Sequence, residues 1–203
     1  MDVNTPYNAS LTREPFMFHE MKVTASLLNR GLSDEEAIEK IVTENLFQYP
    51  TERSLKQRSR GCVRRLRYLD DELISWIDTR SLDVAKQVCL YALMKDSRLV
   101  YEFMLTVIGK QYETKDFSYS REAITVFFMR LQEQSEQVAG WSEVTIKKLI
   151  SVLSGLLKDT GYIDGPNAKR LNEMLIDHKL KEKIVENGDR NMLPAYNYFE
   201  VEA

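Results

Sequence analysis

The sequence predicts an all-α protein arranged as two small helical lobes. Apolar residues recur through most of the chain with the three-to-four-residue spacing of amphipathic helices. The five prolines and eight glycines stand mainly where such helices would begin or end. With 43% hydrophobic and 29% charged residues, the 203-residue chain has a globular composition and enough apolar side chains for one large core or two small ones.

The first lobe is expected to cover residues 1–112. Ser33 and Glu36 have the spacing of a capping box, which predicts a helix start, and Gly31 suits the end of the helix before it. The expected helices are 14–29, 33–44, 51–69, a short one from about 70, and two apolar helices within 81–111 that break near 95–97.

The second lobe is expected to cover residues 113–203, after a polar junction at 113–118 that follows Gly109. Two helices joined by a Gly-Trp-Ser turn have the order of a helix-turn-helix, and a wing is expected after them, which predicts a winged-helix-like lobe with a short β-hairpin. The expected elements are helices 120–137 and 143–159, a short strand and turn at 162–166, a polar helix at 167–178, and a terminal strand at 195–201.

The most informative stretch is 53–67, which holds seven basic residues and no acidic one. On a helix, five of these cations fall within an arc of about 80° and extend over about 21 Å. We call this set the basic face: Arg53, Lys56, Arg60, Arg64 and Arg67. Arginine binds phosphate bidentately and stays charged, so the basic face predicts polyanion binding, with Arg58 and Arg65 as further candidates. The alternative is a solvated face that pairs with acidic neighbours such as those at 70–72.

A second candidate surface lies on the expected helix 143–159. Val144 and several leucines form an apolar side, whereas lysines and small residues occupy the opposite side. The candidate contacts to a duplex are Lys147, Lys148 and Lys158. Amphipathic helices with surface lysines are common, so a solvated face is again the alternative.

Signals for enzyme chemistry are weak. The sequence contains no phosphate-binding glycine loop, no zinc-protease motif and no nucleophile elbow. The two histidines, His19 and His178, have no metal-ligand spacing, and the two cysteines, Cys62 and Cys89, lie among apolar helical residues where a buried thiol is expected. We therefore expect a binding protein with no catalytic residue, metal or other cofactor.

The hydropathy and charge of the chain suit a cytoplasmic protein. No window is apolar enough to cross a membrane, and no secretory leader is expected at the start of the chain. The formal net charge of −3 argues against a uniformly basic surface, but binding of a polyanion depends on the local distribution of charge.

Several strings together resemble the BrxA family of bacterial BREX phage-defence systems. They are LTREPF at 11–16, ENLFQYPTERS at 44–54, LYALMK and RLVYEFM within 90–104, FFMRLQEQ at 127–134 and WSEVTIKKL at 141–149. The resemblance implies a first lobe similar to the NusB-type helical bundle, double-stranded DNA as partner, other BREX components as further partners, and no small-molecule substrate. The last 40 residues carry none of these strings.

Together these observations predict a non-catalytic, double-stranded DNA-binding accessory protein of a BREX system. Two alternatives stay open. The basic face suits an acidic protein partner, which would make the chain an adaptor within the BREX complex, and it suits RNA equally well.

Overall fold

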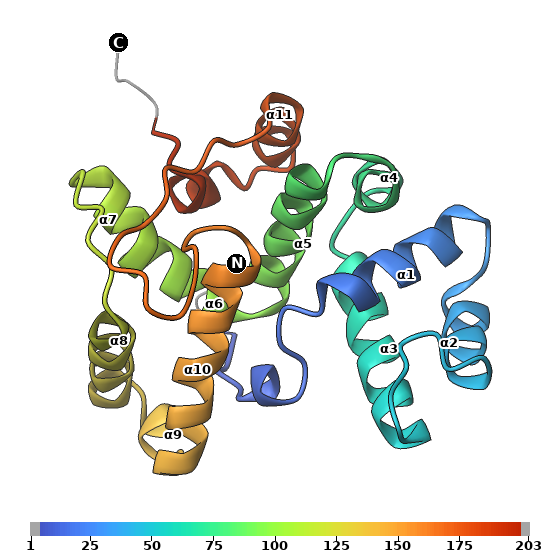
Figure 1. Cartoon of the computed structure of the whole chain (residues 1–203), viewed down its shortest axis with the longest axis horizontal. Coiled ribbons are helices and arrows are strands. Elements are labelled where there is room, and N and C mark those ends of the chain that lie inside the picture. The colour runs from blue at the N-terminus through green and yellow to red at the C-terminus, as the bar shows by residue number, and fades with distance from the viewer. Residues whose placement is uncertain (1–4, 200–203) are drawn as a thin grey trace. The chain divides into compact units, whose positions relative to one another are not determined.

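The computed structural model describes residues 5–199 and folds them into helices and irregular segments (Figure 1). This part of the chain contains an isolated bridge but no regular strand, so the all-α prediction is confirmed and the expected β-hairpin is not formed there. Two compact units are present: residues 13–96, the α1–α5 unit, and residues 5–12 with 97–199, the α6–α11 unit. The chain therefore changes unit at Asp96–Ser97, and the junction expected at 113–118 lies inside the α6–α11 unit.

The α1–α5 unit contains five helices whose order agrees with the sequence prediction. Their bounds are α1 Phe18–Asn29, α2 Asp34–Thr43, α3 Glu52–Leu66, α4 Asp71–Thr79 and α5 Leu82–Asp96. The predicted capping box starts α2, because Ser33 accepts from the Glu36 backbone N–H and the Glu36 carboxylate accepts from the Ser33 backbone N–H. Helix α1 packs on α3 and α4, and α3 and α4 in turn pack on α5.

Helix α1 starts later than the predicted residue 14. Met17 adopts a left-handed backbone conformation with φ of 54°, and the carbonyl oxygens of Glu14, Pro15 and Phe16 accept hydrogen bonds from the Arg65 guanidinium. A distant side chain thus binds the carbonyls that an earlier helix start would have used. Local sequence patterns carry no sign of this interaction.

The α6–α11 unit contains α-helices, two 3₁₀-helices (η1 and η3) and one π-helix (η2) within its described residues. Their bounds are η1 Ser10–Thr12, α6 Arg98–Phe103, η2 Met104–Gly109, α7 Lys110–Glu113, α8 Arg121–Gln134, α9 Glu136–Ala139, α10 Glu143–Asp159, α11 His178–Glu186 and η3 Arg190–Tyr196. Ser97 caps α6, which confirms the predicted break near 95–97. The sequence pattern did not predict η2, a π-helix that is continuous with α6 and α7. Helices α8 and α10 pack side by side, and η1 packs on α10.

The predictions for the chain after α10 are wrong. Residues 162–165 form bends and residue 166 begins a turn where a strand was expected, and residues 167–177 are irregular where a helix was expected. The backbone N–H groups of Tyr119 and Leu171 donate to the carbonyls of Lys169 and Phe117, so long-range pairing replaces local helix bonds. The expected terminal strand is instead the 3₁₀-helix η3 as far as Tyr196, while Glu200 and Val201 lie outside the described residues.

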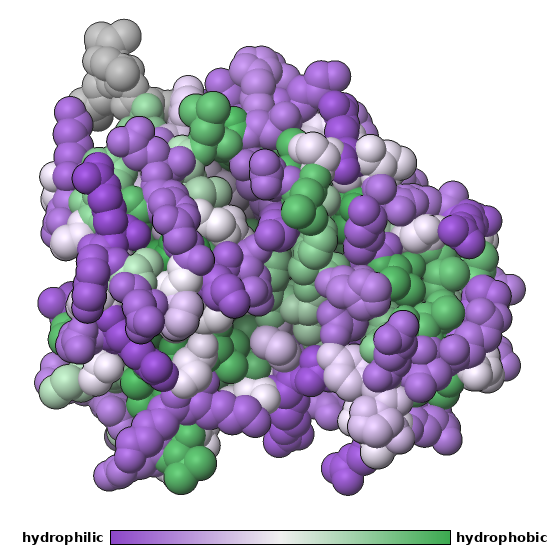
Figure 2. Space-filling model, in the orientation of Figure 1, coloured by the Kyte–Doolittle hydropathy of each residue, from purple (hydrophilic) through white to green (hydrophobic). Residues whose placement is uncertain are grey.

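The face seen in Figure 2 is largely hydrophilic, with hydrophobic side chains showing in separate areas. No helix within residues 5–199 is both long enough and apolar enough to span a membrane.

Candidate nucleic-acid interface

Helix α3 carries the basic face, and its orientation is set by an apolar side. Thr51 caps the helix by accepting a hydrogen bond from the Ser54 backbone N–H at 3.2 Å. The helix packs on α1, α2 and α5. The side chains buried by this packing include Leu55, Cys62, Val63 and Leu66. Because these residues share one side, the other side of α3 is turned toward solvent.

Arg53 and Arg60 are exposed, and neither has a charged partner within the described part of the chain. Both line a surface hollow with a volume of about 640 Å³. The other residues of its wall are Glu14, Glu52, Lys56, Gln57 and Arg64. Two unpaired guanidinium groups in one hollow are available to bind an external anion.

The remaining cations of the basic face already pair with carboxylates. Lys56 binds Glu52 one helical turn away, and this ion pair lowers the pKa of Glu52. The Arg67 Nε donates to Asp34 Oδ2 at 2.6 Å while the Arg67 side chain stays 66% exposed. Solvent-exposed ion pairs of this kind are weak, so an external phosphate can compete for both cations.

Arg64 is held more firmly. Its guanidinium donates to Asp96 at 2.7 and 3.0 Å and to Glu14 at 2.8 Å, and the hydrogen bonds to Asp96 raise its pKa. The Arg64 side chain nevertheless remains 46% exposed. It can therefore contribute positive potential to the hollow without leaving its partners.

Arg58 lies off the basic face. It stacks over the Tyr49 ring with its Cζ 4.4 Å from the ring centroid, and it lies 4.0 Å from Glu20. The Tyr49 hydroxyl donates to Glu20 at 2.5 Å, and burial together with this hydrogen bond raises the pKa of Tyr49 to about 12. Arg58 thus completes a half-buried cluster that joins α1 to α3.

Arg65 is buried, with a side-chain exposure of 1%. Its guanidinium donates to three backbone carbonyls, those of residues 14–16, and to Asp96 at 3.3 Å. Burial lowers the pKa of Arg65. A bound polyanion does not reach this side chain, so among the predicted site residues Arg65 has a structural position.

The lysines predicted on α10 are exposed at its surface. Lys147 lies 3.4 Å from Glu143, whereas Lys148 and Lys158 have no charged partner within residues 5–199. The predicted apolar side is wrong at its first position, since Val144 is 76% exposed. This helix belongs to the α6–α11 unit, so the sequence-predicted site residues fall into two groups on separate units.

The small residues of α10 are covered only in part, since Ser151 stays exposed and a Cβ added at Gly155 would meet no atom within 4 Å. The Ser151 hydroxyl accepts a hydrogen bond from Arg121 at 2.6 Å, and the Ser154 hydroxyl lies 3.1 Å from the Tyr119 hydroxyl. Tyr119, which precedes α8, and Arg121, the first residue of α8, therefore cover part of the side that was expected to approach a duplex closely.

Groups that could support chemistry are few. Within residues 5–199, no three His, Cys, Asp or Glu side chains cluster in a way that could hold a metal ion. Cys62 and Cys89 are fully buried, and burial raises the pKa of Cys62 to about 12 and also raises that of Cys89. His178 lies on the surface, 3.5 Å from Glu182.

Sequence reasoning missed the carboxylates that partner the basic face. The Glu52–Lys56 pair has helical i, i+4 spacing and is readable in principle. Glu14, Asp34 and Asp96 are distant in sequence, so no local signal indicates them. The carboxylate of Asp70, an expected partner, caps α4 by accepting from the Leu73 backbone N–H at 2.8 Å.

The fold and this site define an all-helical protein whose candidate binding surface is an exposed basic helix. The BrxA family model matches residues 5–188, and the chain belongs to the BrxA family. It is 33% identical to a protein named BREX protein BrxA from Bacillus cereus (strain H3081.97), over 90% of this chain and 92% of the relative. A second protein of that name, from Paramagnetospirillum magneticum, is 22% identical over 92% of this chain and 94% of its own length.

A solved structure supports the fold. The crystal structure of an uncharacterized protein from Magnetospirillum magneticum superimposes with a TM-score of 0.80 at 21% identity. The match covers 96% of this chain and 100% of that one. The similarity therefore extends over both helical units.

Proposed function

We propose that this chain is a component of a bacterial BREX phage-defence system and that it binds double-stranded DNA through the basic face of α3. The BREX assignment rests on the names of the BrxA relatives. The DNA-binding role rests on one observation, the exposed and unpaired state of Arg53 and Arg60 in a common hollow. The proposal includes other BREX proteins as partners and a cytoplasmic location, and it includes no catalytic step, cofactor, membrane or small-molecule substrate.

The spacing of the two free arginines suits a nucleic-acid backbone. Arg53 and Arg60 are seven residues apart, which places them on one side of α3 and about 10.5 Å apart along its axis. Phosphates along one strand of B-form DNA advance by about 3.4 Å of helix axis per step. Because the strand also winds about this axis, the distance between two phosphates exceeds their axial rise, and the long arginine side chains can reach two separate phosphates of one strand. Contacts of this kind position a protein on DNA without reading its sequence.

Binding strength should depend steeply on salt. Two phosphate contacts give a log-log salt slope of about −1.8, and all five cations of the basic face give about −4.5. The contacts of the basic face alone should therefore lower affinity between about 12-fold and about 500-fold from 50 to 200 mM salt. The value within this range reports how many of Lys56, Arg64 and Arg67 exchange their carboxylate partners for phosphate.

The α10 lysines form a second set of proposed contacts. Lys147, Lys148 and Lys158 are exposed and have side chains long enough to reach phosphates. Because Ser151 and Ser154 are engaged by Arg121 and Tyr119, we assign these lysines to backbone contacts and not to groove reading. Arg58 and Arg65 are not part of the proposed interface.

One observation favours a second candidate, an adaptor role. The basic face already accommodates carboxylates, as the pairs of Lys56, Arg64 and Arg67 illustrate. An acidic protein surface can replace those carboxylates in the same way as a phosphate. RNA would use the same cations, and the expected NusB-like character of the first lobe points to it as well.

Anisotropy titration of a fluorescent 20-base-pair duplex at 50 and 200 mM salt tests the proposal. We expect saturable binding with a salt slope of −1.8 or steeper, and unlabelled duplex should compete better than a structured RNA of equal charge. If the RNA competed better than the duplex, RNA and not double-stranded DNA would be the polyanion assigned to the basic face. Absence of duplex binding at 50 mM salt, or a flat salt dependence, would contradict the proposal and leave the adaptor role.

A further inference from the structure

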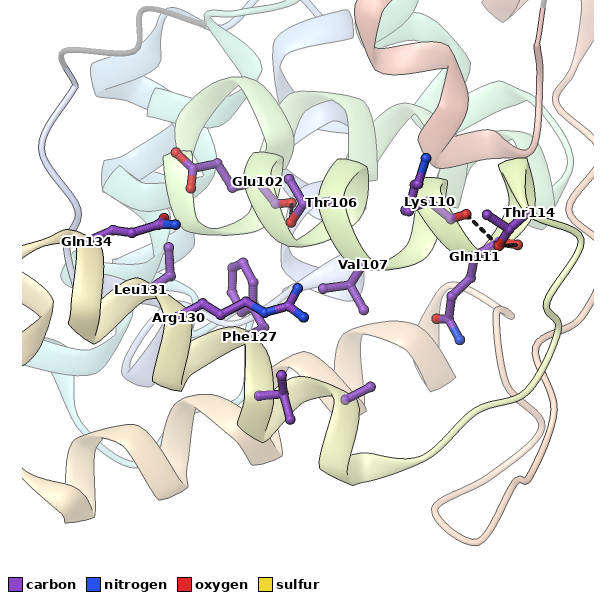
Figure 3. A pocket seen from close by; sticks show the side chains of 12 residues that line it. Glu102, Thr106, Val107, Lys110, Gln111, Thr114, Phe127, Arg130, Leu131 and Gln134 are labelled. Carbon is purple, nitrogen blue, oxygen red and sulfur yellow. Dashed lines mark hydrogen bonds between the residues drawn. The ribbon is translucent and has the colours of Figure 1, made fainter.

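A groove runs along the α6–α11 unit between the continuous helix α6–η2–α7 and helix α8 (Figure 3). Its volume is about 450 Å³. One wall is built from residues four apart on the continuous helix: Glu102, Thr106, Lys110 and Thr114. The twelve residue steps from Glu102 to Thr114 correspond to at most about 18 Å at the α-helical rise, so the groove is about as long as three turns of a helix.

The groove has an apolar floor and polar edges. Val107, Phe127 and Leu131 lie along its base, and Val126 beside them is 43% exposed. Threonine, glutamine and charged side chains form the rims. This arrangement is typical of surfaces that bind the apolar side of an amphipathic helix, whose anchors recur at i, i+3, i+4 and i+7.

The charges around the groove leave a single cation without a partner. The Glu102 carboxylate accepts hydrogen bonds from Arg98 at 2.6 Å and from the Tyr7 hydroxyl at 2.6 Å. Lys110 pairs with Glu113 at 2.6 Å. Arg130 is exposed, has no charged partner among residues 5–199, and lies between the continuous helix and α8 in Figure 3. The groove is thus complementary to an apolar ligand that carries a carboxylate.

The π-helix η2 forms part of the groove wall on the continuous helix. Thr106 and Val107 both lie in η2 and both line the groove. The opposite side of η2 is fixed, since a Cβ on Gly109 would lie 3.2 Å from Pro194 of η3. Short π-helical segments are rare and occur frequently at functional sites, so η2 is an independent observation that points to the groove.

We propose that this groove binds an acidic amphipathic helix of a protein partner. The apolar anchors of that helix occupy the floor formed by Val107, Phe127 and Leu131, and one of its Asp or Glu residues pairs with Arg130. The choice of BREX proteins as the source of the helix rests on the proposed function. The groove lies on a different unit from α3, so its role is separable from DNA binding.

The probe is an array of overlapping 15-residue peptides that covers the other proteins encoded in the same BREX island. Bound peptides are then remade with fluorescein and titrated against the full chain. We expect the binders to share helical apolar spacing with an acidic residue. We also expect Arg130→Glu to weaken them by about tenfold, because like charges then face each other. Val126→Asp should weaken them to a similar extent by placing a carboxylate beside the floor.

Lys179→Glu is the matched control, since Lys179 is an exposed cation of the same unit outside the groove and its substitution should leave affinity unchanged. Circular dichroism melting of each variant distinguishes misfolding from a specific loss of peptide binding. If no peptide binds, or if binders are basic or insensitive to Arg130→Glu, the inference is overturned. The duplex titration is run on the same variants. Loss of peptide binding with duplex binding retained then concerns the groove alone, and loss of duplex binding concerns the proposed function.

Discussion

Arg64 and Arg65 are adjacent in sequence and bind the same carboxylate, that of Asp96, yet their side chains are 46% and 1% exposed. Arg64 approaches Asp96 from the solvent side of α3 and also binds Glu14. Arg65 approaches from the buried side and fixes the backbone at residues 14–16. One helix therefore holds a structural arginine and a surface arginine side by side, and substitutions can separate the two roles.

Replacement of Arg65 should destabilise the fold. Arg65→Met leaves three backbone carbonyls and part of Asp96 without their donor, and loss of one partner of such a buried network costs about 3 kcal/mol. Arg60→Ala, on the exposed side of the same helix, should change the free energy of unfolding by less than about 0.5 kcal/mol. Urea denaturation measures both. Equal stabilities of the two variants would contradict the structural role of Arg65.

Removal of an acidic partner from the basic face should strengthen DNA binding. Glu52 pairs with Lys56 and lines the hollow with Arg53, so its carboxylate repels phosphate and competes for the lysine. We expect Glu52→Gln to raise duplex affinity by about two- to fivefold at 50 mM salt. Glu35→Gln, the same change at an exposed position of α2, is the control for net charge. Equal effects of the two variants would show that net charge, not local competition, controls affinity.

The capping box at the start of α2 should contribute measurably to stability. Ser33→Ala removes the acceptor for the Glu36 backbone N–H, and loss of such a cap costs about 1 kcal/mol. Hydrogen bonds with Ser33 lower the pKa of Glu36, so the contribution of this carboxylate should be present at neutral pH and lost in acid. Chemical denaturation at pH 7 and pH 3 checks both statements. A Ser33→Ala variant as stable as the parent at pH 7 would contradict the cap.

Alkaline pH should weaken the cluster around Tyr49. The pKa of Tyr49 is raised to about 12 from 10.0, so between these values the folded state keeps a proton that the unfolded state has lost. The free energy of unfolding should therefore fall as pH rises above 10. Tyr49→Phe should be less stable at pH 8, because the hydrogen bond to Glu20 is lost, but its stability should fall less steeply from pH 10 to 11.

Tyr68→Phe serves as the control for this pH series, since Tyr68 is 44% exposed. The free energy of unfolding of Tyr68→Phe should change with pH in the same way as that of the parent protein from pH 8 to 11. If Tyr49→Phe also followed the parent, the buried hydrogen bond to Glu20 would not account for the alkaline loss.

Local signals predicted the parts of the fold that depend on nearby residues. The start of α2 follows from the spacing of Ser33 and Glu36, and the outward side of α3 follows from the 3.6-residue period. Long-range hydrogen bonds decided the rest. The start of α1 depends on Arg65, and the irregular path of 167–177 depends on backbone pairing between 117–119 and 169–171.

The candidate site shows the same division. Periodicity grouped Arg53, Lys56, Arg60, Arg64 and Arg67 on one side of a helix. It gave no means to know that Asp34 and Asp96 would engage Arg67 and Arg64, because these carboxylates are about 30 residues away in sequence. Only a tertiary structure shows that Arg64 and Arg67 are paired, whereas the i, i+4 spacing of Glu52 and Lys56 indicates that pair in the sequence. The set of five exposed cations therefore reduces to two free ones, Arg53 and Arg60.

Duplex binding by Arg53→Glu/Arg60→Glu, compared with the parent protein and with Arg30→Glu/Arg80→Glu, tests whether α3 is the DNA-binding surface. The control makes the same change in net charge at exposed positions of the same unit that do not line the hollow. We predict that the first variant melts like the parent, loses at least tenfold in affinity at 50 mM salt, and has a salt slope shallower by about 1.8. Equal affinities for the two double variants would contradict the assignment of α3 as the DNA-binding surface.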